Sequence, residues 1–457
     1  MSSPPPSISL RLWMIATVTG SGAFMAMLDS TVANLAIDTI GKEFDAPLGD
    51  VQWIATSYLI ALALSLPLTA WLARRFGSSR LWAAATLAFV AASILCGMSR
   101  DLTTLTVARC LQGLAAGLMV PVGQAVLSEA ADRQQLGRLM GTVGFAVALG
   151  PALGPGFGGV LIETLSWRWL FWINVPVGII AVVAARYVLP LGETSSKGRL
   201  DTIGLLLIGL GLPLVLYGAA RIGVSGTTAS SLLIMAFGIT LSIAFVIHAR
   251  RSSAPLIEVR LFRRAGFAAA VATASLTGAA MYGGLLLIPL YLQESLHQSP
   301  TDAGLMLFTM GLGSAVVLPL AGNLTDRYGA LAVSVAGSAI LLLSTAAFLF
   351  YSIPLVATLA SLLFVRGGGL ALAQMPAMTA AYAAVAKSET GDAATLINIA
   401  QRLGGALGAI ATVIMLEQAT GTGKQATYVW GLGLLVVFAI GSMVTSMLFK
   451  RPLTQSV

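Results

Sequence analysis

The chain has 457 residues, of which 57% are hydrophobic and 10% are charged, and its formal net charge is +8 at pH 7. Soluble globular proteins carry about 25% charged residues, so this composition excludes a soluble domain, with or without a membrane anchor. It indicates a chain that is embedded in a membrane over its whole length.

Apolar runs of about 20 residues, long enough to cross a bilayer as helices, recur from one end of the chain to the other. A short tail rich in Pro and Ser precedes the first run, which is too long for the core of a removable signal peptide. The sequence therefore predicts an all-α polytopic membrane protein. Its fourteen expected spans cover residues 12–37, 50–72, 81–99, 103–128, 139–163, 169–189, 202–221, 229–249, 266–293, 303–323, 330–351, 354–385, 394–416 and 427–449.

The basic residues indicate how these spans are oriented. With the amino terminus placed in the cytoplasm, 18 of the 26 Lys and Arg residues fall in cytoplasmic segments, five on the opposite side and three near or within spans. Cytoplasmic loops of membrane proteins carry the excess of Lys and Arg. Both termini are therefore expected in the cytoplasm, and the net positive charge reflects topology rather than nucleic-acid binding. The basic segment 250–264 is expected to touch anionic lipid headgroups.

Asp29, in the first span, is the one acid of the 18 Asp and Glu residues that is expected inside the hydrocarbon. A carboxylate there costs at least a few kcal/mol, so an intramembrane acid is by default a functional hypothesis. Burial favours the neutral carboxyl, which suits a group that takes up and releases a proton. The alternative is a structural polar residue that pairs with a neighbouring helix.

The fourth span places Arg109 and Gln112 three residues apart, so they share one helix face. Because arginine stays charged, Arg109 could offset the charge of Asp29 after proton release. A snorkelling or purely structural arginine is the alternative. For Arg366 and Arg402 the snorkelling or structural interpretation is favoured, since both are expected near the cytoplasmic ends of their spans.

The fifth span carries Gly150, Gly154 and Gly158 at intervals of four residues, which gives one smooth helix face. Pro155 removes the hydrogen bond to the carbonyl of Pro151 and provides a bend. A bendable, closely packed helix suits a gating interface, although plain helix packing explains the same residues.

An internal repeat predicts the architecture. Pro67 and the run Arg75-Phe76-Gly77 recur as Pro319 and Arg327-Tyr328-Gly329 at a constant offset, so the second span matches the tenth. Two like-oriented halves that rock about a midplane site are the physical basis of alternating access. The predicted parts are a tail (1–11), a six-helix half (12–189), a linker with two inserted helices (190–265), a second six-helix half (266–450) and a tail (451–457).

These motifs together resemble the major facilitator superfamily, in particular its fourteen-helix drug/proton antiporter branch. Leu28-Asp29-Ser30-Thr31-Val32-Ala33-Asn34 is similar to the first-helix motif of that branch, and Arg109 with Gln112-Gly113 resembles its fourth-helix motif. Gly150-Pro151-Ala152-Leu153-Gly154-Pro155 with Gly158 resembles its fifth-helix antiporter motif. The resemblance implies the major facilitator fold, with two six-helix halves and two inserted helices.

The resemblance also implies roles for single residues. Asp29 and Arg109 are expected to couple transport to protons, and Asn34, Gln112 and Gly113 to line the substrate cavity. The gating residues are expected to be Gly150, Pro151, Gly154, Pro155, Gly158, Arg74, Arg75, Gly77, Asp326, Arg327 and Gly329.

One position departs from the family pattern. Arg74 stands where the cytoplasmic loop motif normally has an Asp, whereas the second copy keeps its acid at Asp326. Because the family's carboxylate is implicated in locking the cytoplasmic gate, we expect a weak lock in the first half.

The predicted function is proton-coupled export of small amphipathic, drug-like compounds across a bacterial-type inner membrane. The single acid favours cationic substrates, and Arg109 leaves anionic ones open. Substrate, protons and lipids are the expected partners. No metal, cofactor or ATP is expected, because Cys96 and Cys110 lack metal spacing and Gly421-Thr422-Gly423-Lys424 lacks the rest of a phosphate loop. The alternatives are an exporter of one metabolite, a polytopic membrane enzyme and a non-transporting sensor.

Overall fold

The computed structural model describes residues 8–449, with gaps at 47, 52, 133–134, 191–199, 226–227, 254, 297, 299, 351–355 and 420–423. Every regular element in these residues is a helix, as predicted. The Gly421–Gly423 segment and the side chains of Asn34 and of residues 151–157 lie outside this description.

The first half of the molecule runs from α1 to α10. Its helices are α1 (Leu10–Leu35), α2 (Ile37–Glu43), α3 (Leu48–Val51), α4 (Trp53–Ser65), η1 (Leu66–Leu68), α5 (Thr69–Phe76), α6 (Ser78–Met98), α7 (Leu102–Ala130), α8 (Leu136–Thr164), α9 (Trp169–Trp172) and α10 (Asn174–Val188). The second predicted span is thus divided into α4 and α5 by a short 3₁₀ turn that contains Pro67. Proline cannot continue the helical hydrogen-bond ladder, which accounts for the break.

The second half runs from α13 to α18, after two central helices. The central helices are α11 (Thr202–Ser225) and α12 (Ala229–Arg251), followed by the short turn η2 (Val259–Arg263). The second half contains α13 (Ala265–Leu290), η3 (Tyr291–Ser295), α14 (Pro300–Tyr328), α15 (Ala330–Phe350), α16 (Val356–Ala383), η4 (Lys387–Glu389), α17 (Thr390–Ala419) and α18 (Lys424–Met447).

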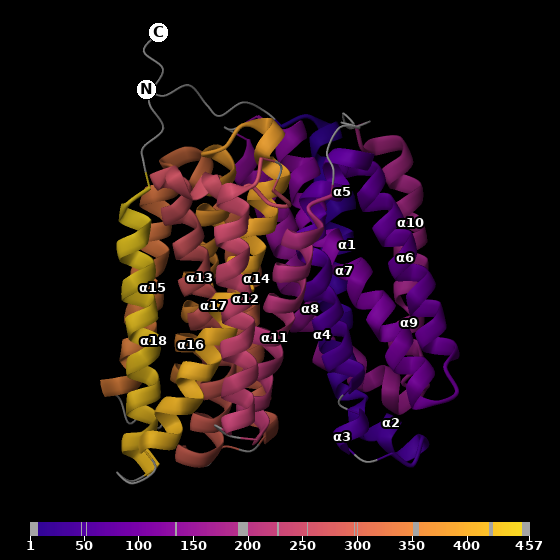
Figure 1. The fold of residues 1–457 in the computed structure, drawn as a ribbon. Helices are drawn as coiled ribbons and strands as arrows, with labels where there is room; N and C mark the ends of the chain where they lie inside the picture. The colour runs from indigo at the N-terminus through magenta and orange to yellow at the C-terminus, as the bar shows by residue number, and fades with distance from the viewer. Residues whose placement is uncertain are drawn as a thin grey trace.

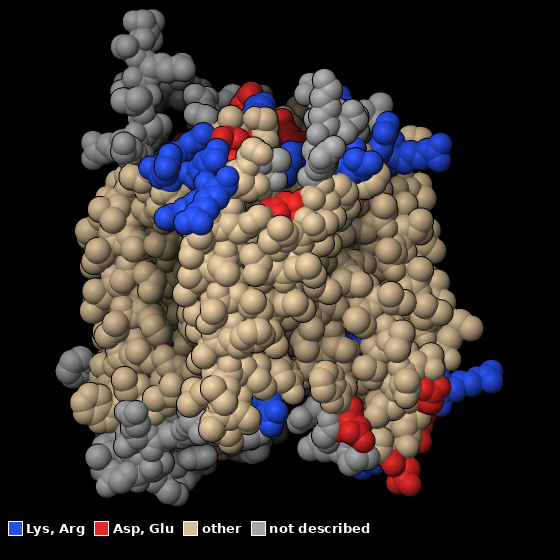
Figure 2. All heavy atoms as spheres, viewed as in Figure 1, with Lys and Arg blue, Asp and Glu red and all other residues tan. Residues whose placement is uncertain are grey.

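The helices agree with the predicted spans in order and number. Thirteen spanning segments of the described chain are long and apolar enough to cross a membrane, and the fifth predicted span, in α8, is counted among shorter apolar helices as Leu136–Val147. Many large apolar side chains point outward, for example Leu233 and Ile180 at 70% and 68% exposure. The space-filling view shows the broad uncharged belt that results, with most Lys and Arg gathered at one end (Figure 2).

That end, where α1 begins and α18 ends, is called the terminal face below (Figure 1). The two halves meet near it, along α8 and α14. Gly141 and Gly322 allow this approach, because a Cβ atom at Gly141 would lie 3.0 Å from the carbonyl oxygen of Leu318 and one at Gly322 would overlap the backbone of Gly137. Small residues commonly permit such close backbone contact between membrane helices. Toward the opposite face, Trp53 at the start of α4 stacks on Tyr217 of α11, with the ring centres 6.2 Å apart.

Candidate functional site: a buried carboxylate and the contacts between the halves

A buried polar cluster joins four helices of the first half. Asp29, on α1, accepts hydrogen bonds from Arg109 Nη1 on α7 (2.5 Å), from Gln112 Nε2 on α7 (2.9 Å) and from Asn174 Nδ2 on α10 (3.1 Å). The hydroxyl of Ser93, on α6, also accepts from Gln112 at 2.6 Å and from Asn174 at 3.2 Å. Asp29 and Arg109 are 0% and 1% exposed, so the cluster is closed to water.

Tyr58, on α4, covers the cationic side of this cluster. The Arg109 guanidinium carbon lies 4.1 Å from the centre of the Tyr58 ring, and Arg109 Nε donates to the Ile54 carbonyl at 3.2 Å. The Tyr58 hydroxyl donates to the Ala26 carbonyl on α1 at 3.2 Å. Arg109 is therefore held by a carboxylate, an amide, a carbonyl and an aromatic face, and Tyr58 separates it from the rest of the molecule.

This arrangement suits a proton-dependent switch. Both oxygens of the ionised carboxylate have donors, so the ion pair is fully satisfied although it is buried. Protonation of Asp29 would leave the Arg109 charge without its partner, and removing one partner of a buried pair typically costs about 3–5 kcal/mol.

The structure brings together some of the predicted site residues and separates others. Asp29 and Arg109 form the expected pair. Gln112 was expected to line a substrate cavity, but it is 0% exposed and instead bonds Asp29 and Arg109. Gly113 is buried against α4, where a Cβ atom would overlap the Tyr58 carbonyl, so this residue serves helix packing rather than a cavity.

The predicted fifth-helix motif lies within α8, and Gly158 is buried. A Cβ atom at Gly150 would lie 2.6 Å from Met27 Cβ, so this glycine packs against α1 two residues before Asp29. The contact at Gly150 lies inside the first half and not at the boundary between the halves. Residues 151–157 continue the helix, although their side chains are outside the description.

One contact between the halves lies at the start of α8. Asp326, on α14, accepts from the backbone amides of Gly137 and Arg138 and from Arg138 Nε, each at 3.0 Å. These amides belong to the first turn of α8, where unsatisfied N–H groups and the helix dipole favour a carboxylate. Asp326 therefore caps a helix of the opposite half; we name this contact the Asp326 clamp.

A second contact lies at the start of α17 and differs from our expectation. Arg74, which replaces the family's acid, donates to Asp392 Oδ2 at 2.6 Å and to the Leu256 carbonyl at 3.3 Å. Asp392, in the first turn of α17, also accepts from the Glu258 amide at 3.1 Å. An ion pair thus occupies the place where a weak lock was expected; we name it the Arg74 clamp.

A third group of polar side chains crosses between the halves deeper in the bundle. Gln124, on α7, accepts from Tyr382 on α16 at 3.1 Å and from Asn398 on α17 at 2.9 Å. All three side chains are buried. The halves are consequently joined through α5, α7 and α8 over a depth of several helical turns from the terminal face.

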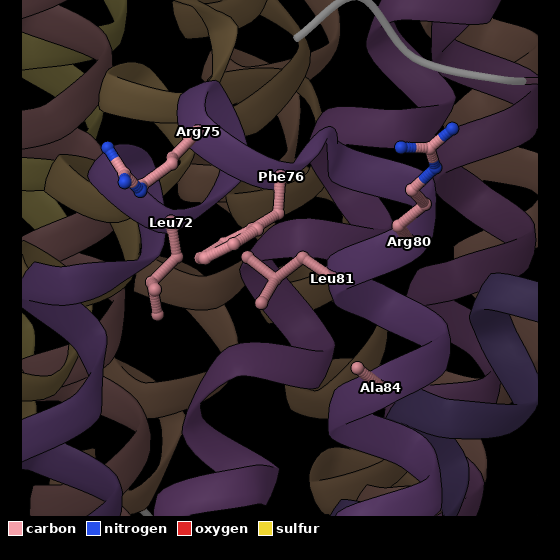
Figure 3. Close-up of a pocket in the computed structure, with 6 residues that line it drawn as sticks. All are labelled: Leu72, Arg75, Phe76, Arg80, Leu81 and Ala84. Atoms are coloured by element: carbon pink, nitrogen blue, oxygen red, sulfur yellow. The ribbon is translucent and has the colours of Figure 1, made fainter. Parts of the chain in front are cut away.

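The repeated loop motif adopts the same local structure in both halves. Gly77 and Gly329 have φ values of +84° and +85°, which glycine adopts without strain and which explains its place in both copies. Arg75 and Arg327 each stack on the aromatic residue that follows, at 5.9 Å and 5.2 Å. A pocket of about 520 Å³ lies beside the first copy, and its lining consists of Leu72, Arg75, Phe76, Arg80, Leu81 and Ala84 (Figure 3). It lies away from the Asp29 cluster.

Two arginines lie deeper in their helices than expected. Arg366 was predicted near a cytoplasmic span end, but it is the eleventh of 28 residues in α16 and is 0% exposed. Arg402 is the thirteenth of 30 residues in α17 and is partly exposed. Neither arginine can reach solvent beyond the headgroups by snorkelling from such a position.

Sequence reasoning missed several members of these contacts. Asn174 is the one amide residue in its predicted span, and that isolation is the signal that could have selected it. Ser93 had no such signal, because Thr86 and Ser99 lie in the same predicted span. Asp392 had no such signal, because it lies in a polar loop with other charges. Its partnership with Arg74 depends on how the halves pack.

Comparison with known proteins agrees with this architecture. The sequence pattern described as "Major Facilitator Superfamily" matches residues 19–409 and 270–456. The chain is 35% identical over 423 residues to the "Multidrug resistance protein B homolog" of Mycobacterium tuberculosis, covering 91% of this chain and 78% of that protein. It is 34% identical over 361 residues to the "Putative multidrug resistance protein MdtD" of Salmonella heidelberg, covering 78% and 74% of the two chains.

Solved structures are similar at lower identity. The human organic anion transporter MFSD10 (TETRAN) superposes with a TM-score of 0.64 at 15% identity, over 96% of this chain and all of that one. The proton:xylose symporter XylE superposes with a TM-score of 0.63 at 16% identity, over 94% of each chain. These two likenesses show the fold alone. With the family match and the relatives, they establish that this chain is a transporter of the major facilitator superfamily, in its fourteen-helix drug/proton antiporter branch.

Proposed function

We propose that this protein exports small amphipathic compounds in exchange for protons, with Asp29 as the group that binds the proton. The observation that carries the proposal is the Asp29 cluster: a fully buried carboxylate inside the membrane span, held by an arginine and two amides from two other helices, α7 and α10. Intramembrane carboxylates of this kind mark proton relays. The drug-resistance names of the relatives support export as the direction.

The terminal face is taken as cytoplasmic, since 18 of the 26 basic residues fall in segments on that side. Under this orientation the Asp326 clamp and the Arg74 clamp close the cytoplasmic end. The conformation is then closed toward the cytoplasm, and Asp29 is shielded from water within it. A bacterial inner membrane is the proposed location.

A continuous set of contacts links the proton site to the Asp326 clamp. Helix α1 packs along α8, with Gly20 near Ala146 and Gly150 near Met27, and the start of α8 is held by Asp326. Protonation of Asp29 would weaken the attachment of α1 to α7 and shift α1 against α8. We propose that this shift releases the clamps and opens the cytoplasmic side.

The test is transport by the purified protein in proteoliposomes with an imposed pH gradient. Two probes with one aromatic body and permanent charges are suitable, 1-pyrenesulfonate and (1-pyrenylmethyl)trimethylammonium, because neither crosses a bilayer by losing its charge. Uphill movement of either probe that stops when the gradient is collapsed would support the proposal. Equal flux with and without the gradient would contradict proton coupling.

A further inference from the structure

The second half contains a fully buried cation that has no acidic partner in the described part of the chain. Arg366 donates to the Ala280 carbonyl at 2.8 Å, to the Thr345 hydroxyl at 3.3 Å and to the Met310 sulfur at 3.1 Å. All three acceptors are neutral, and no described charged side chain acts on this guanidinium. An unpaired charge at this depth is costly, and intramembrane charges of this kind mark substrate or ion pathways.

The internal repeat shows what Arg366 lacks. The offset between the loop motifs maps Tyr58 onto Met310 of α14 and Asp29 onto Met281 of α13, so Arg366 has neighbours that correspond to those of Arg109, although the same offset places Ser361 at the position of Arg109 itself. Where Arg109 meets a carboxylate on α1, Arg366 meets Ala280 and Gly284 on α13. The second half keeps the cation and has lost the acid.

Arg402 adds a second positive charge, on the side of α17 that faces the first half. Asn398, one turn earlier on the same face, bonds Gln124 of the first half at 2.9 Å. Arg402 is partly exposed, and among the described side chains it forms no ion pair.

The charges deep within the described spans therefore do not balance. Asp29 and Arg109 neutralise one another, and Arg366 and Arg402 remain. A cationic substrate would have to use Asp29, but that carboxylate is fully buried behind Tyr58 and already has three donors. A positive group placed between the halves would meet repulsion from Arg402.

We propose that the exported compounds are amphipathic organic anions, carrying a carboxylate or sulfonate that pairs with Arg402 on the face of α17 that is directed toward the first half. The inference rests on the proposed transport function and names its substrate class. The positive charge of Arg366 would make the electrostatic potential of the second half more positive, which also favours an anionic substrate.

The proposal has a consequence for coupling. Protonation of Asp29 adds positive charge, so a proton and an anion do not repel each other; exchange must arise because the two ligands favour different conformations. Outward movement of an anion against inward movement of a proton also transfers net positive charge inward. An interior-negative potential alone should then drive export.

The test compares binding of the two pyrene probes to the purified full-length protein by quenching of its tryptophan fluorescence. We expect 1-pyrenesulfonate to bind at least about tenfold more tightly than (1-pyrenylmethyl)trimethylammonium, which corresponds to about 1.4 kcal/mol. Arg402→Gln should weaken binding of the sulfonate by about tenfold and leave the ammonium unchanged or tighter, and Arg402→Lys should restore most of the loss. Arg100→Gln, an equal charge change at an exposed position outside the spans, is the matched control and should bind like the wild type.

Tighter binding of the ammonium, or equal sulfonate affinity in wild type and Arg402→Gln, would overturn the substrate assignment. These outcomes are separable from a failure of the transport proposal. Gradient-driven flux of the ammonium alone would leave proton-coupled export standing and reject organic anions. Tight sulfonate binding that depends on Arg402, without gradient-driven flux, would support organic anions as the ligands and reject proton-coupled export.

Discussion

Each half of the molecule has a buried arginine at its centre, but the two arginines have different neighbours. In the first half, Arg109 is paired with Asp29 at 2.5 Å, whereas in the second half Arg366 has three neutral acceptors. Because the halves share a repeated architecture, the difference lies in side chains and not in the backbone. It indicates a division of labour, in which one half responds to protons through a closed neutral pair and the other provides fixed positive charge.

The largest expected effect comes from removing the charge of the first-half pair. Asp29→Asn should lower the rate of gradient-driven transport by about a hundredfold or more, because the amide mimics a permanently protonated carboxyl. The variant should remain folded, since an amide can still accept from Gln112 and Asn174. Probe accumulation in proteoliposomes measures the effect, and retention of full uphill transport would remove Asp29 from the mechanism.

Removing the cation from the same pair should move the pH dependence rather than abolish activity. In Arg109→Gln the ionised form of Asp29 loses its counter-charge, so proton release should require a pH higher by about one to three units. The pH profile of 1-pyrenesulfonate binding reports this change. An unchanged profile would mean that Arg109 has a structural role only.

The second half can be made to resemble the first. Thr345→Asp would place a carboxylate where the hydroxyl now accepts from Arg366 Nε, which would neutralise that arginine as Asp29 neutralises Arg109. We expect affinity for the sulfonate probe to fall by about tenfold, equivalent to about 1.4 kcal/mol. Thr345→Asn, which has the same shape without the charge, should bind like the wild type. Equal affinities in the Asp and Asn variants would mean that Arg366 does not influence the substrate.

The two clamps provide a smaller contrast between the halves. Asp326 is 3% exposed and accepts two backbone amides at a helix start, so Asp326→Asn should destabilise the closed cytoplasmic side by about 1–2 kcal/mol. Arg74 is 39% exposed, and its pair with Asp392 should contribute less than about 1 kcal/mol after screening by solvent. Distances between spin labels across the terminal face would compare Asp326→Asn with Arg74→Gln. We expect the larger opening in Asp326→Asn, and a larger opening in Arg74→Gln would contradict this ranking of the two clamps.

Arg74→Asp should open the same face, because it places an acid opposite Asp392. The double variant Arg74→Asp/Asp392→Arg should restore closure by exchanging the charges. The family pattern alone predicts the opposite, because an acid at position 74 would complete the loop motif and favour closure. The geometry reverses the sign of that prediction, because the acid at this contact is supplied by α17.

The helices and the Asp29–Arg109 pair were predictable for physical reasons. Long apolar runs form helices in a bilayer, because every backbone polar group there must be hydrogen-bonded within the protein. A lone intramembrane acid needs a polar partner at a similar depth on a neighbouring helix. The roles of Gln112 and Gly113 were not predictable, since a residue on a known helix can face either a cavity or a neighbour. Arg366 was misplaced because a basic residue in an apolar run resembles a snorkelling arginine until the helix bounds are known.

Simultaneous recording of protons and substrate tests the central claim most directly. A pH-sensitive dye trapped in proteoliposomes would report proton entry while the sulfonate probe leaves down its own gradient. We expect the wild type to acidify the lumen as the probe leaves, and Asp29→Asn to allow probe exchange across the membrane without any acidification. Acidification coupled to probe movement in Asp29→Asn at the wild-type ratio would contradict Asp29 as the proton-carrying group.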